Sequence, residues 1–289
     1  MDFLRPSTWD EALQAKAEHP DAVPLAGGTD VMVELNFDRR RPPALLDLTR
    51  VGELTDWSAE RKAGGERLRI GAGVTYRRII DELGDRLPGL AMAARTVGSP
   101  QIRNRGTVGG NLGSASPAGD AHPPLLAGAA EVELASVRGV RTVPVTEFFT
   151  GPKRSVLAPD ELIAAFLLPA ATGAQQFAKV GTRNAMVIAV CSFALALHPA
   201  ERRIGTGIGS AGPTPLRATE AESFAAELPW DAREALPDST IQRFGELVAA
   251  AARPIDDVRG SAAYRRHALA VLGGRTLRWA WEEYRCTST

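Results

Sequence analysis

The stretch TVGGNLGSASPAGD, residues 107–120, contains four glycines and almost no large side chain, and it ends with a carboxylate. Adjacent glycines tolerate positive φ and let backbone N–H groups turn toward one point, which creates a concavity that suits an anion. A second stretch, LAGGTD at residues 25–30, also joins two glycines to a hydroxyl and an acid. One such stretch is more typical of a tight turn, but two of them favour one shared ligand.

A diphosphate is the ligand that best suits these stretches, because hydrogen bonds to charged groups let a few N–H donors hold it. Hydroxyl groups that can add donors belong to Thr29, Thr107, Ser114 and Ser116. Asp30 and Asp120 would repel a phosphate, but their carboxylates accept well from sugar or ribityl hydroxyls. The scarcity of large side chains would then let the backbone come close to the ligand.

Composition excludes several classes of function. The 289 residues include 34 Lys plus Arg and 34 Asp plus Glu, so no excess of positive charge favours a nucleic acid or an anionic membrane. The longest apolar runs are shorter than the ~20 residues of a membrane-spanning helix, and the first residues do not resemble a signal peptide. We therefore expect a soluble cytoplasmic protein.

Metal chemistry is not expected on this chain. The two cysteines, Cys191 and Cys286, lack the spacing of zinc or iron–sulfur ligands. The histidines are scattered singly and are interpreted as solvated or capping residues: His19, His122, His198 and His267. Any metal would then be held by another chain.

Hydrophobic periodicity predicts an α+β chain with a boundary near residues 170–176, where the texture changes to AATGAQQ. Ser7 is expected to cap a first helix, and Thr29 or Asp30 a second. The remaining helices are expected at 76–83 and 123–129 and around 241–252 and 264–272; the strands at 44–51, 66–75, 131–137, 161–168, 177–181, 187–197 and 203–210. GIGSAG (207–212) matches GxGxxG, but Pro213 and Pro215 prevent a helix from opening there, so a strand end and loop are expected instead.

Five segments resemble, in order, the FAD-binding medium subunit of the molybdenum hydroxylases, the xanthine dehydrogenase and carbon monoxide dehydrogenase family. The segments are LAGGTDVMVELN, GSPQIRNRGTVGGNLGSASPAGD, FFTGPKRSVLAPDELI, FAKVGTRNAM and PIDDVRGSAAYRRHALAVL, which together extend over most of the chain. The resemblance implies a two-lobed FAD-binding domain of the vanillyl-alcohol oxidase (PCMH) type at residues 1–172, with lobes of roughly 1–55 and 56–172. It implies a smaller α+β C-terminal domain of the CO dehydrogenase flavoprotein type at 173–289.

The resemblance also implies the residues that contact FAD. They are Leu25, Ala26, Gly27, Gly28, Thr29, Asp30, Val31, Thr107, Gly109, Gly110, Asn111, Ser114, Ser116, Asp120, Leu162 and Lys179. Leu162 would pack near the adenine or the flavin, and Lys179 would lie near the isoalloxazine. A cation there would stabilise the anionic reduced flavin, although a solvated strand end is the other interpretation of Lys179.

The same resemblance implies an oxidoreductase subunit that relays electrons and has no catalytic residue of its own. The partners would be an iron–sulfur small subunit with [2Fe-2S] clusters and a large subunit with the molybdopterin cofactor, in a dimer of heterotrimers. The absence of cluster-forming cysteines argues against the branch of the family whose flavin subunit carries an extra cluster. Two alternatives stay open: a self-sufficient FAD-dependent oxidase or dehydrogenase, and a flavin-free assembly scaffold whose glycine stretches are only turns.

Overall fold

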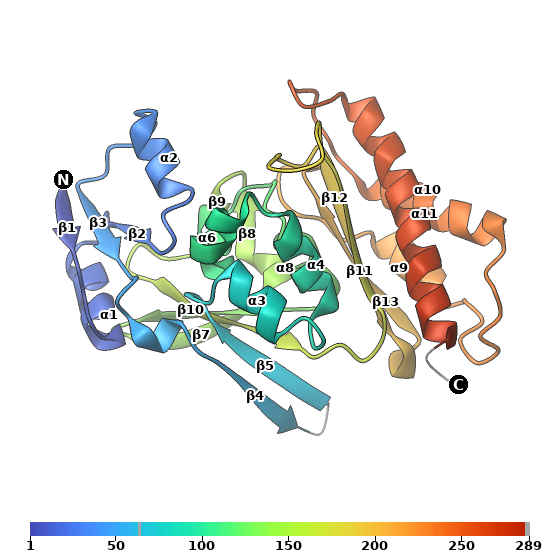
Figure 1. The fold of residues 1–289 in the computed structure, drawn as a ribbon, viewed down its shortest axis with the longest axis horizontal. Coiled ribbons are helices and arrows are strands. Elements are labelled where there is room, and N and C mark those ends of the chain that lie inside the picture. The colour runs from blue at the N-terminus through green and yellow to red at the C-terminus, as the bar shows by residue number, and fades with distance from the viewer. Residues whose placement is uncertain (63–64, 287–289) are drawn as a thin grey trace.

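Three β-sheets follow one another along the chain, and helices lie between them (Figure 1). The structure is a computed structural model that describes residues 1–62 and 65–286. The first sheet is parallel with the order β1-β3-β2, the second antiparallel with the order β4-β5-β10-β6-β7, and the third antiparallel with the order β11-β12-β13. A small hairpin of β8 and β9 lies beside the second sheet.

The first sheet and its helices form the N-terminal part of the molecule. Its strands are β1 Asp2–Leu4, β2 Val23–Leu25 and β3 Ala44–Asp47, and its helices are α1 Trp9–Glu18, α2 Val31–Asn36 and the 3-10 helix Gly52–Leu54. Thr8, not Ser7 as predicted, caps α1, because its hydroxyl accepts from the Glu11 amide at 3.2 Å. Ser7 instead donates to the Glu11 carboxylate, which completes a reciprocal cap one residue later than expected.

The second sheet carries most of the short helices. Its strands are β4 Trp57–Lys62, β5 Gly65–Gly71, β6 Glu131–Ser136, β7 Gly139–Pro144 and β10 Leu162–Pro169, and the hairpin is β8 Phe149–Gly151 with β9 Arg154–Ser155. The helices are α3 Tyr76–Glu82, α4 Pro88–Thr96, α5 Pro100–Arg105, α6 Val108–Ser114, α7 His122–Ala127 and α8 Val145–Phe148. Leu68 and Ile70 are fully buried, as the alternating pattern of β5 predicts.

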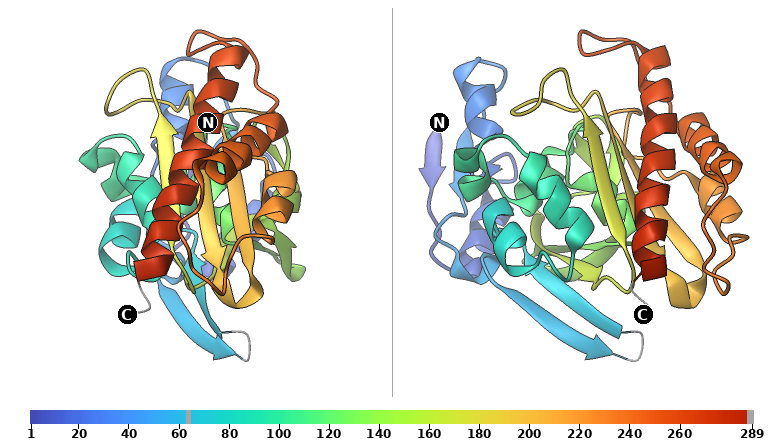
Figure 2. Two further views of the ribbon diagram at one scale, coloured as in Figure 1. Left: turned by 90° about the vertical axis from the view of Figure 1, so that its right-hand side faces the viewer. Right: turned by 45° about the vertical axis from the view of Figure 1, so that its right-hand side comes forward.

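The third sheet lies between two layers of helices (Figure 2). Its strands are β11 Gln175–Val180, β12 Cys191–His198 and β13 Arg203–Gly209; the helices after them are the 3-10 helix Pro199–Glu201, α9 Thr219–Ala225, α10 Asp238–Ala251 and α11 Ala262–Cys286. One face contacts α4 and α7, and the other contacts α9 and α11. Coverage on both faces explains why β12 is a continuous apolar run, buried from Cys191 to Leu197.

Gly205, just before GIGSAG, and Gly207, its first residue, serve this packing. An ideal Cβ on Gly205 or Gly207 would lie 2.0 Å from the carbonyl oxygen of Ala127 or Pro123, so β13 approaches α7 as closely as backbone allows. The strand ends at Gly209, and Ser210 takes a left-handed φ of 58°. The predicted strand end and loop are therefore confirmed.

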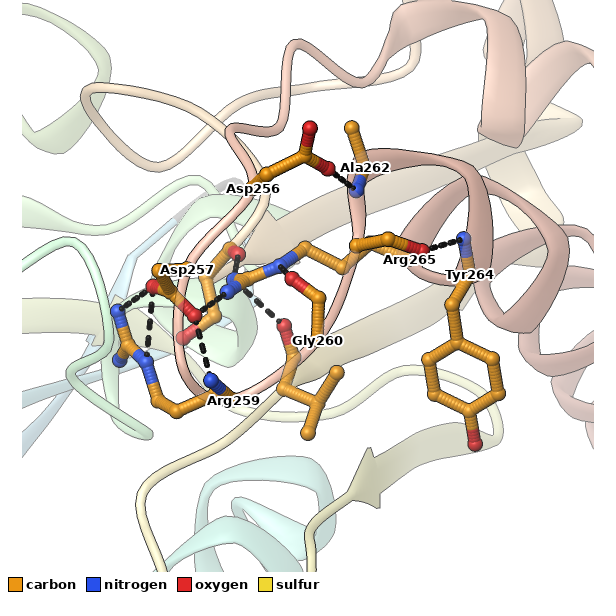
Figure 3. A network of polar contacts seen from close by, with 10 residues as sticks. Asp256, Asp257, Arg259, Gly260, Ala262, Tyr264 and Arg265 are labelled. Atoms are coloured by element: carbon orange, nitrogen blue, oxygen red, sulfur yellow. Dashed lines mark hydrogen bonds and ion pairs between the residues drawn. The ribbon is translucent and has the colours of Figure 1, made fainter.

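A buried arginine fixes the start of α11 to one end of the third sheet (Figure 3). The Arg265 side chain is 2 % exposed and donates to the carbonyl oxygens of Val190 at 2.9 Å and Ser210 at 2.6 Å. It also pairs with Asp257 at 2.5 Å. Hydrogen bonds from Arg259 and Arg265 hold the pKa of Asp257 well below its usual range. Since Val190 precedes β12 and Ser210 follows β13, this network secures the end of the sheet where β11 finishes.

Two large cores correspond to the two halves of the chain. One gathers residues between Ala12 and Leu168, and the other gathers residues between Ala174 and Trp281. A small third cluster joins the halves across α4, α7, β11 and β12; its members are Ala93, Ala127, Phe177, Ala194 and Ala196. The boundary predicted at residue 172 lies between β10 and β11, and the division into domains stays a prediction.

No helix within the described residues combines the length and the apolar character that crossing a bilayer requires. Over residues 1–62 and 65–286, His, Cys, Asp and Glu side chains form no group of three or more that could hold a metal ion. Cys191 is buried and is a free thiol, and Cys286 is exposed.

Candidate functional site

The two glycine-rich stretches are far apart in the sequence, and the fold brings them into contact. We call residues 25–31 the first glycine segment and residues 107–120 the second glycine segment. The first begins at Leu25, the last residue of β2, and ends at Val31, the first residue of α2. Gly28 has a φ of 74°, a conformation that glycine adopts without the Cβ penalty.

Backbone of the first segment packs against the residues that lead into the second. An ideal Cβ on Gly27 would lie 2.0 Å from the Arg105 carbonyl oxygen, and one on Gly106 would lie 3.4 Å from Thr29 Oγ1. An ideal Cβ on Gly110 would lie 4.0 Å from the Ala26 Cβ. The two segments therefore share one location, and glycine is required at Gly27 for their close approach.

The second glycine segment is not the open loop that its composition suggests. Residues Val108–Ser114 form helix α6, capped by the Thr107 hydroxyl, which accepts from the Gly110 amide at 2.8 Å. An ideal Cβ on Gly109 would lie 2.5 Å from the Ala72 carbonyl oxygen, so this glycine lets α6 pack on the chain that follows β5. No helix is predicted from the sequence at these residues, and the helix forms because tertiary packing outweighs the low helix propensity of glycine.

Asp120 and Lys179 form a buried ion pair. Lys179 Nζ lies 2.5 Å from Asp120 Oδ2, and each side chain is 8 % exposed. Thr96 supports the pair: its hydroxyl lies 3.3 Å from Asp120 Oδ2 and its carbonyl oxygen 3.3 Å from Lys179 Nζ. Burial raises the pKa of Asp120, and the charge of Lys179 opposes that rise. The interpretation of Lys179 as a solvated strand end is wrong.

Of the other predicted contact residues, two serines make hydrogen bonds to nearby backbone, whereas Asp30 and Leu162 make none with their side chains among the described residues. Ser114 donates its hydroxyl proton to the Asn111 carbonyl oxygen at 3.0 Å, and the Ser116 hydroxyl accepts from the Ala118 amide at 3.3 Å, so both already serve the local backbone. Asp30 precedes α2 but makes no capping hydrogen bond with its side chain. Leu162, at the start of β10, is 2 % exposed and belongs to the first core.

Two buried polar residues at this location were not predicted. Tyr76, the first residue of α3, is 3 % exposed. His122, the first residue of α7, is fully buried, and Nε2 lies 3.2 Å from the Asn111 carbonyl oxygen. Its ring centre lies 4.5 Å from that of Phe149, and burial lowers its pKa from 6.5 to about 4. The expectation that all histidines are solvated or capping was wrong here; the apolar run after His122 was the indication of burial.

Several polar atoms around the segments are buried without a hydrogen-bond partner among the described residues. They include Tyr76 Oη, Asn111 Oδ1 and Asp120 Oδ1. Buried polar groups in proteins are nearly always paired, so such a cluster indicates a place where a polar ligand completes the hydrogen bonding. Gly110 and Gly113 are exposed on the surface beside them, which leaves a face of small residues open to a ligand.

Comparison with known families and proteins accounts for both halves of the chain. Residues 1–171 match the family described as FAD binding domain in molybdopterin dehydrogenase, and residues 176–280 match the CO dehydrogenase flavoprotein C-terminal domain. The xanthine dehydrogenase FAD-binding subunit of Escherichia coli O157:H7 is 33% identical over 281 residues, covering 93% of this chain and 92% of that protein. The nicotinate dehydrogenase FAD-subunit of Eubacterium barkeri is 32% identical over 242 residues, covering 79% of this chain and 80% of that protein.

A solved structure shares the whole architecture. Carbon monoxide dehydrogenase from Hydrogenophaga pseudoflava, in a form lacking the Mo-pyranopterin moiety, superposes with a TM-score of 0.88 at 28% identity and 98% coverage of both chains. The predicted fold class, an FAD-binding domain followed by a smaller α+β domain, is confirmed. The chain therefore belongs to the family of FAD-binding medium subunits of the molybdenum hydroxylases, which are oxidoreductases.

Proposed function

We propose that this chain relays electrons within a molybdenum hydroxylase complex, accepting them from an iron–sulfur subunit and passing them through FAD to an external acceptor. The observation that carries the proposal is the close contact of the two glycine segments beside the buried Asp120–Lys179 pair. Relatives named as FAD subunits of xanthine and nicotinate dehydrogenases support it.

The residues present fit FAD. Close backbone approach at Gly27 and the exposed Gly110 leave room for a diphosphate, and Asp120 Oδ1 and Asn111 Oδ1 are buried acceptors without a partner in the described part of the chain. Ribityl hydroxyls are the donors that such acceptors need. We therefore propose the FAD contacts expected from the sequence, with the hydroxyls of Ser114 and Ser116 reoriented from their present backbone partners.

FAD supplies one-electron and two-electron redox chemistry when it is bound. The chain's own residues bind it, exclude water and fix charge. Asp120 keeps a counter-charge 2.5 Å from Lys179, so the ammonium group is held in place although it is buried. A cation fixed in this way near the flavin would favour negative charge on the reduced ring system.

The partners follow from the same proposal. An iron–sulfur small subunit would carry the [2Fe-2S] clusters, a large subunit would carry the molybdopterin cofactor, and the assembly would be a cytoplasmic dimer of heterotrimers. The glyceraldehyde dehydrogenase medium chain of Sulfolobus acidocaldarius, 30% identical over 277 residues, supports a role as one chain among several.

Reconstitution of the purified chain with FAD tests cofactor binding. We expect a yellow protein whose thermal midpoint rises with FAD concentration, as ligand linkage requires. Gly110→Val should abolish FAD binding, because its side chain would occupy the exposed face beside Ala26, and should leave the FAD-free protein folded. Gly52→Val is the matched control, since an ideal Cβ on Gly52 meets nothing within 4 Å. A wild-type chain that stays colourless would support the scaffold alternative instead.

Co-purification of the complex from its native host tests electron relay. Anaerobic addition of the organic substrate should bleach the flavin absorbance only when the partner chains are present. Turnover of a small molecule by the isolated chain would contradict the relay and favour the self-sufficient oxidase or dehydrogenase.

A further inference from the structure

Tyr76 is fixed to the junction of the two glycine segments. Its amide donates to the Gly106 carbonyl oxygen at 3.0 Å, and the preceding Thr75 forms a β-bridge with Thr107. An ideal Cβ on Gly106 would lie 3.4 Å from Cδ2 of the Tyr76 ring. The ring therefore packs beside the same residue that contacts Thr29 of the first segment.

The phenol hydroxyl has nothing to donate to. Tyr76 is 3 % exposed, and Oη is buried without a hydrogen-bond partner among residues 1–62 and 65–286. Burial raises the pKa of Tyr76 well above its usual value, and the charges of Asp120 and Asp30 add to the effect. The hydroxyl therefore keeps its proton and remains a hydrogen-bond donor at the pH values at which proteins are usually studied.

Tyr284, which is half-buried, shows what a tyrosine hydroxyl does elsewhere in the same chain. Its hydroxyl donates to the Trp230 carbonyl oxygen at 3.0 Å. A buried hydroxyl that makes no such bond is less stable than the phenyl ring of phenylalanine would be at the same position. A donor retained at that cost, between two segments that face a cofactor site, points to an acceptor that arrives with the cofactor.

We propose that the Tyr76 hydroxyl donates a hydrogen bond to an oxygen of bound FAD, in the part of the dinucleotide held between the two glycine segments. This inference rests on the proposed FAD site. Tyr76 would be a binding residue that none of the sequence patterns identified, because its role comes from an unpaired buried atom and not from a motif.

Tyr76→Phe tests the proposal with two readouts that need no enzyme activity. The dissociation constant for FAD, measured by titration of FAD-free protein, should rise about tenfold, equivalent to about 1.4 kcal/mol. The thermal midpoint of the FAD-free variant should equal or exceed that of the wild type. A parallel titration with ADP locates the acceptor: weaker ADP binding assigns it to the diphosphate, and unchanged ADP binding assigns it to the ribityl or flavin side.

Tyr284→Phe is the matched control with the opposite pattern. It should lower the thermal midpoint of the FAD-free protein by about 2–4 °C, since a partly buried hydrogen bond is lost, and leave FAD affinity unchanged. The proposal is overturned if Tyr76→Phe binds FAD as tightly as the wild type, or if it is destabilised without FAD as Tyr284→Phe is. A wild-type chain that does not bind FAD would instead overturn the proposed function.

Discussion

A single methyl group at Gly27 should separate the two glycine segments. The added Cβ would lie 2.0 Å from the Arg105 carbonyl oxygen, and backbone cannot give way as a flexible side chain does. We expect Gly27→Ala to cost about 1–3 kcal/mol of folding stability and to weaken FAD binding at least tenfold. Calorimetry and FAD titration measure the two effects. Gly52→Ala, in open space, should change neither, and wild-type FAD affinity in Gly27→Ala would contradict the contact.

His122 makes stability depend on pH. Its pKa falls from 6.5 in the unfolded chain to about 4 in the fold, so below pH 6.5 the unfolded chain takes up a proton that the native state refuses. Stability should therefore decline as the pH falls from 6.5 to 4, by up to roughly 3 kcal/mol.

Urea unfolding of the FAD-free protein at several pH values measures this decline. His122→Asn should reduce the dependence in that window, leaving the contribution of His198, whose pKa is also lowered by burial, whereas His267→Asn, on the exposed side of α11, should retain the full dependence. An identical slope in His122→Asn and wild type would show that other groups cause it.

At the scale of residues, the sequence predicts the chemistry of the site better than its contacts. The paired glycines, the hydroxyls and the acids are visible as types, but nothing local shows that Lys179 reaches Asp120 across 59 positions. Tyr76 and His122 were missed for a related reason, because their burial comes from neighbours that are distant in sequence.

Arg265 fixes the start of helix α11 to the end of the third sheet. Its guanidinium joins the start of α11 to Val190 and Ser210 (Figure 3). These two residues adjoin the end of the sheet where Ser192 of β12 pairs with Lys179 of β11 and with Gly209 of β13. Arg265→Met would leave Asp257 without one of its partners and two buried carbonyl groups without a donor. We expect a loss of about 3–5 kcal/mol, because breaking a buried pair is strongly destabilising.

Chemical denaturation measures that loss, and FAD titration should show weaker binding because the end of β11 is no longer held. Arg266→Met, one position along and exposed, provides the control and should lie within about 0.5 kcal/mol of the wild type. A near-neutral Arg265→Met would show that the network is not important for the position of the third sheet.

The elements that periodicity predicts are those whose burial is one-sided or continuous. The strands β5, β6 and β12 and the helix α10 were found within a few residues of their observed bounds, whereas for α11 only the first part, around 264–272, was predicted of the helix Ala262–Cys286. The helices α4, α5 and α6 were missed, because glycine-rich, proline-started or short helices carry a weak periodic pattern and are stabilised by packing. The strands β1 and β4 were missed as well, since short or exposed edge strands show little alternation of burial.

The two halves of the molecule are joined where β13 crosses α7. Gly207→Ala would place a Cβ 2.0 Å from the Pro123 carbonyl oxygen and force β13 away from the helix. We expect a lower thermal midpoint and weaker FAD binding, because the third sheet carries Lys179 toward Asp120. Scanning calorimetry with FAD titration tests both effects together.

Gly139→Ala is a useful comparison for the stability measurement. Gly139 has open space around it but a φ of 129°, so its variant is strained without any clash. It should lower the midpoint while leaving FAD affinity unchanged, since β7 lies at the far edge of the second sheet. Equal FAD affinity in Gly207→Ala and Gly139→Ala would show that the contact of β13 with α7 does not affect the cofactor site.

The overall architecture could be predicted because five segments agree with one family, and the class of fold is confirmed. What sequence patterns could not supply is how the third sheet docks on the first half. That arrangement depends on shape at α4 and α7, where alanine and glycine permit close contact without any distinctive motif.

The Asp120–Lys179 pair takes its negative charge from the segment before α7 and its positive charge from β11. A ligand that engages both residues is bound only when the two halves stay docked, so its binding free energy stabilises the docked arrangement. Because such linkage is reciprocal, a partner protein that binds the third sheet and shifts how the halves dock would also change the affinity of the proposed site for FAD.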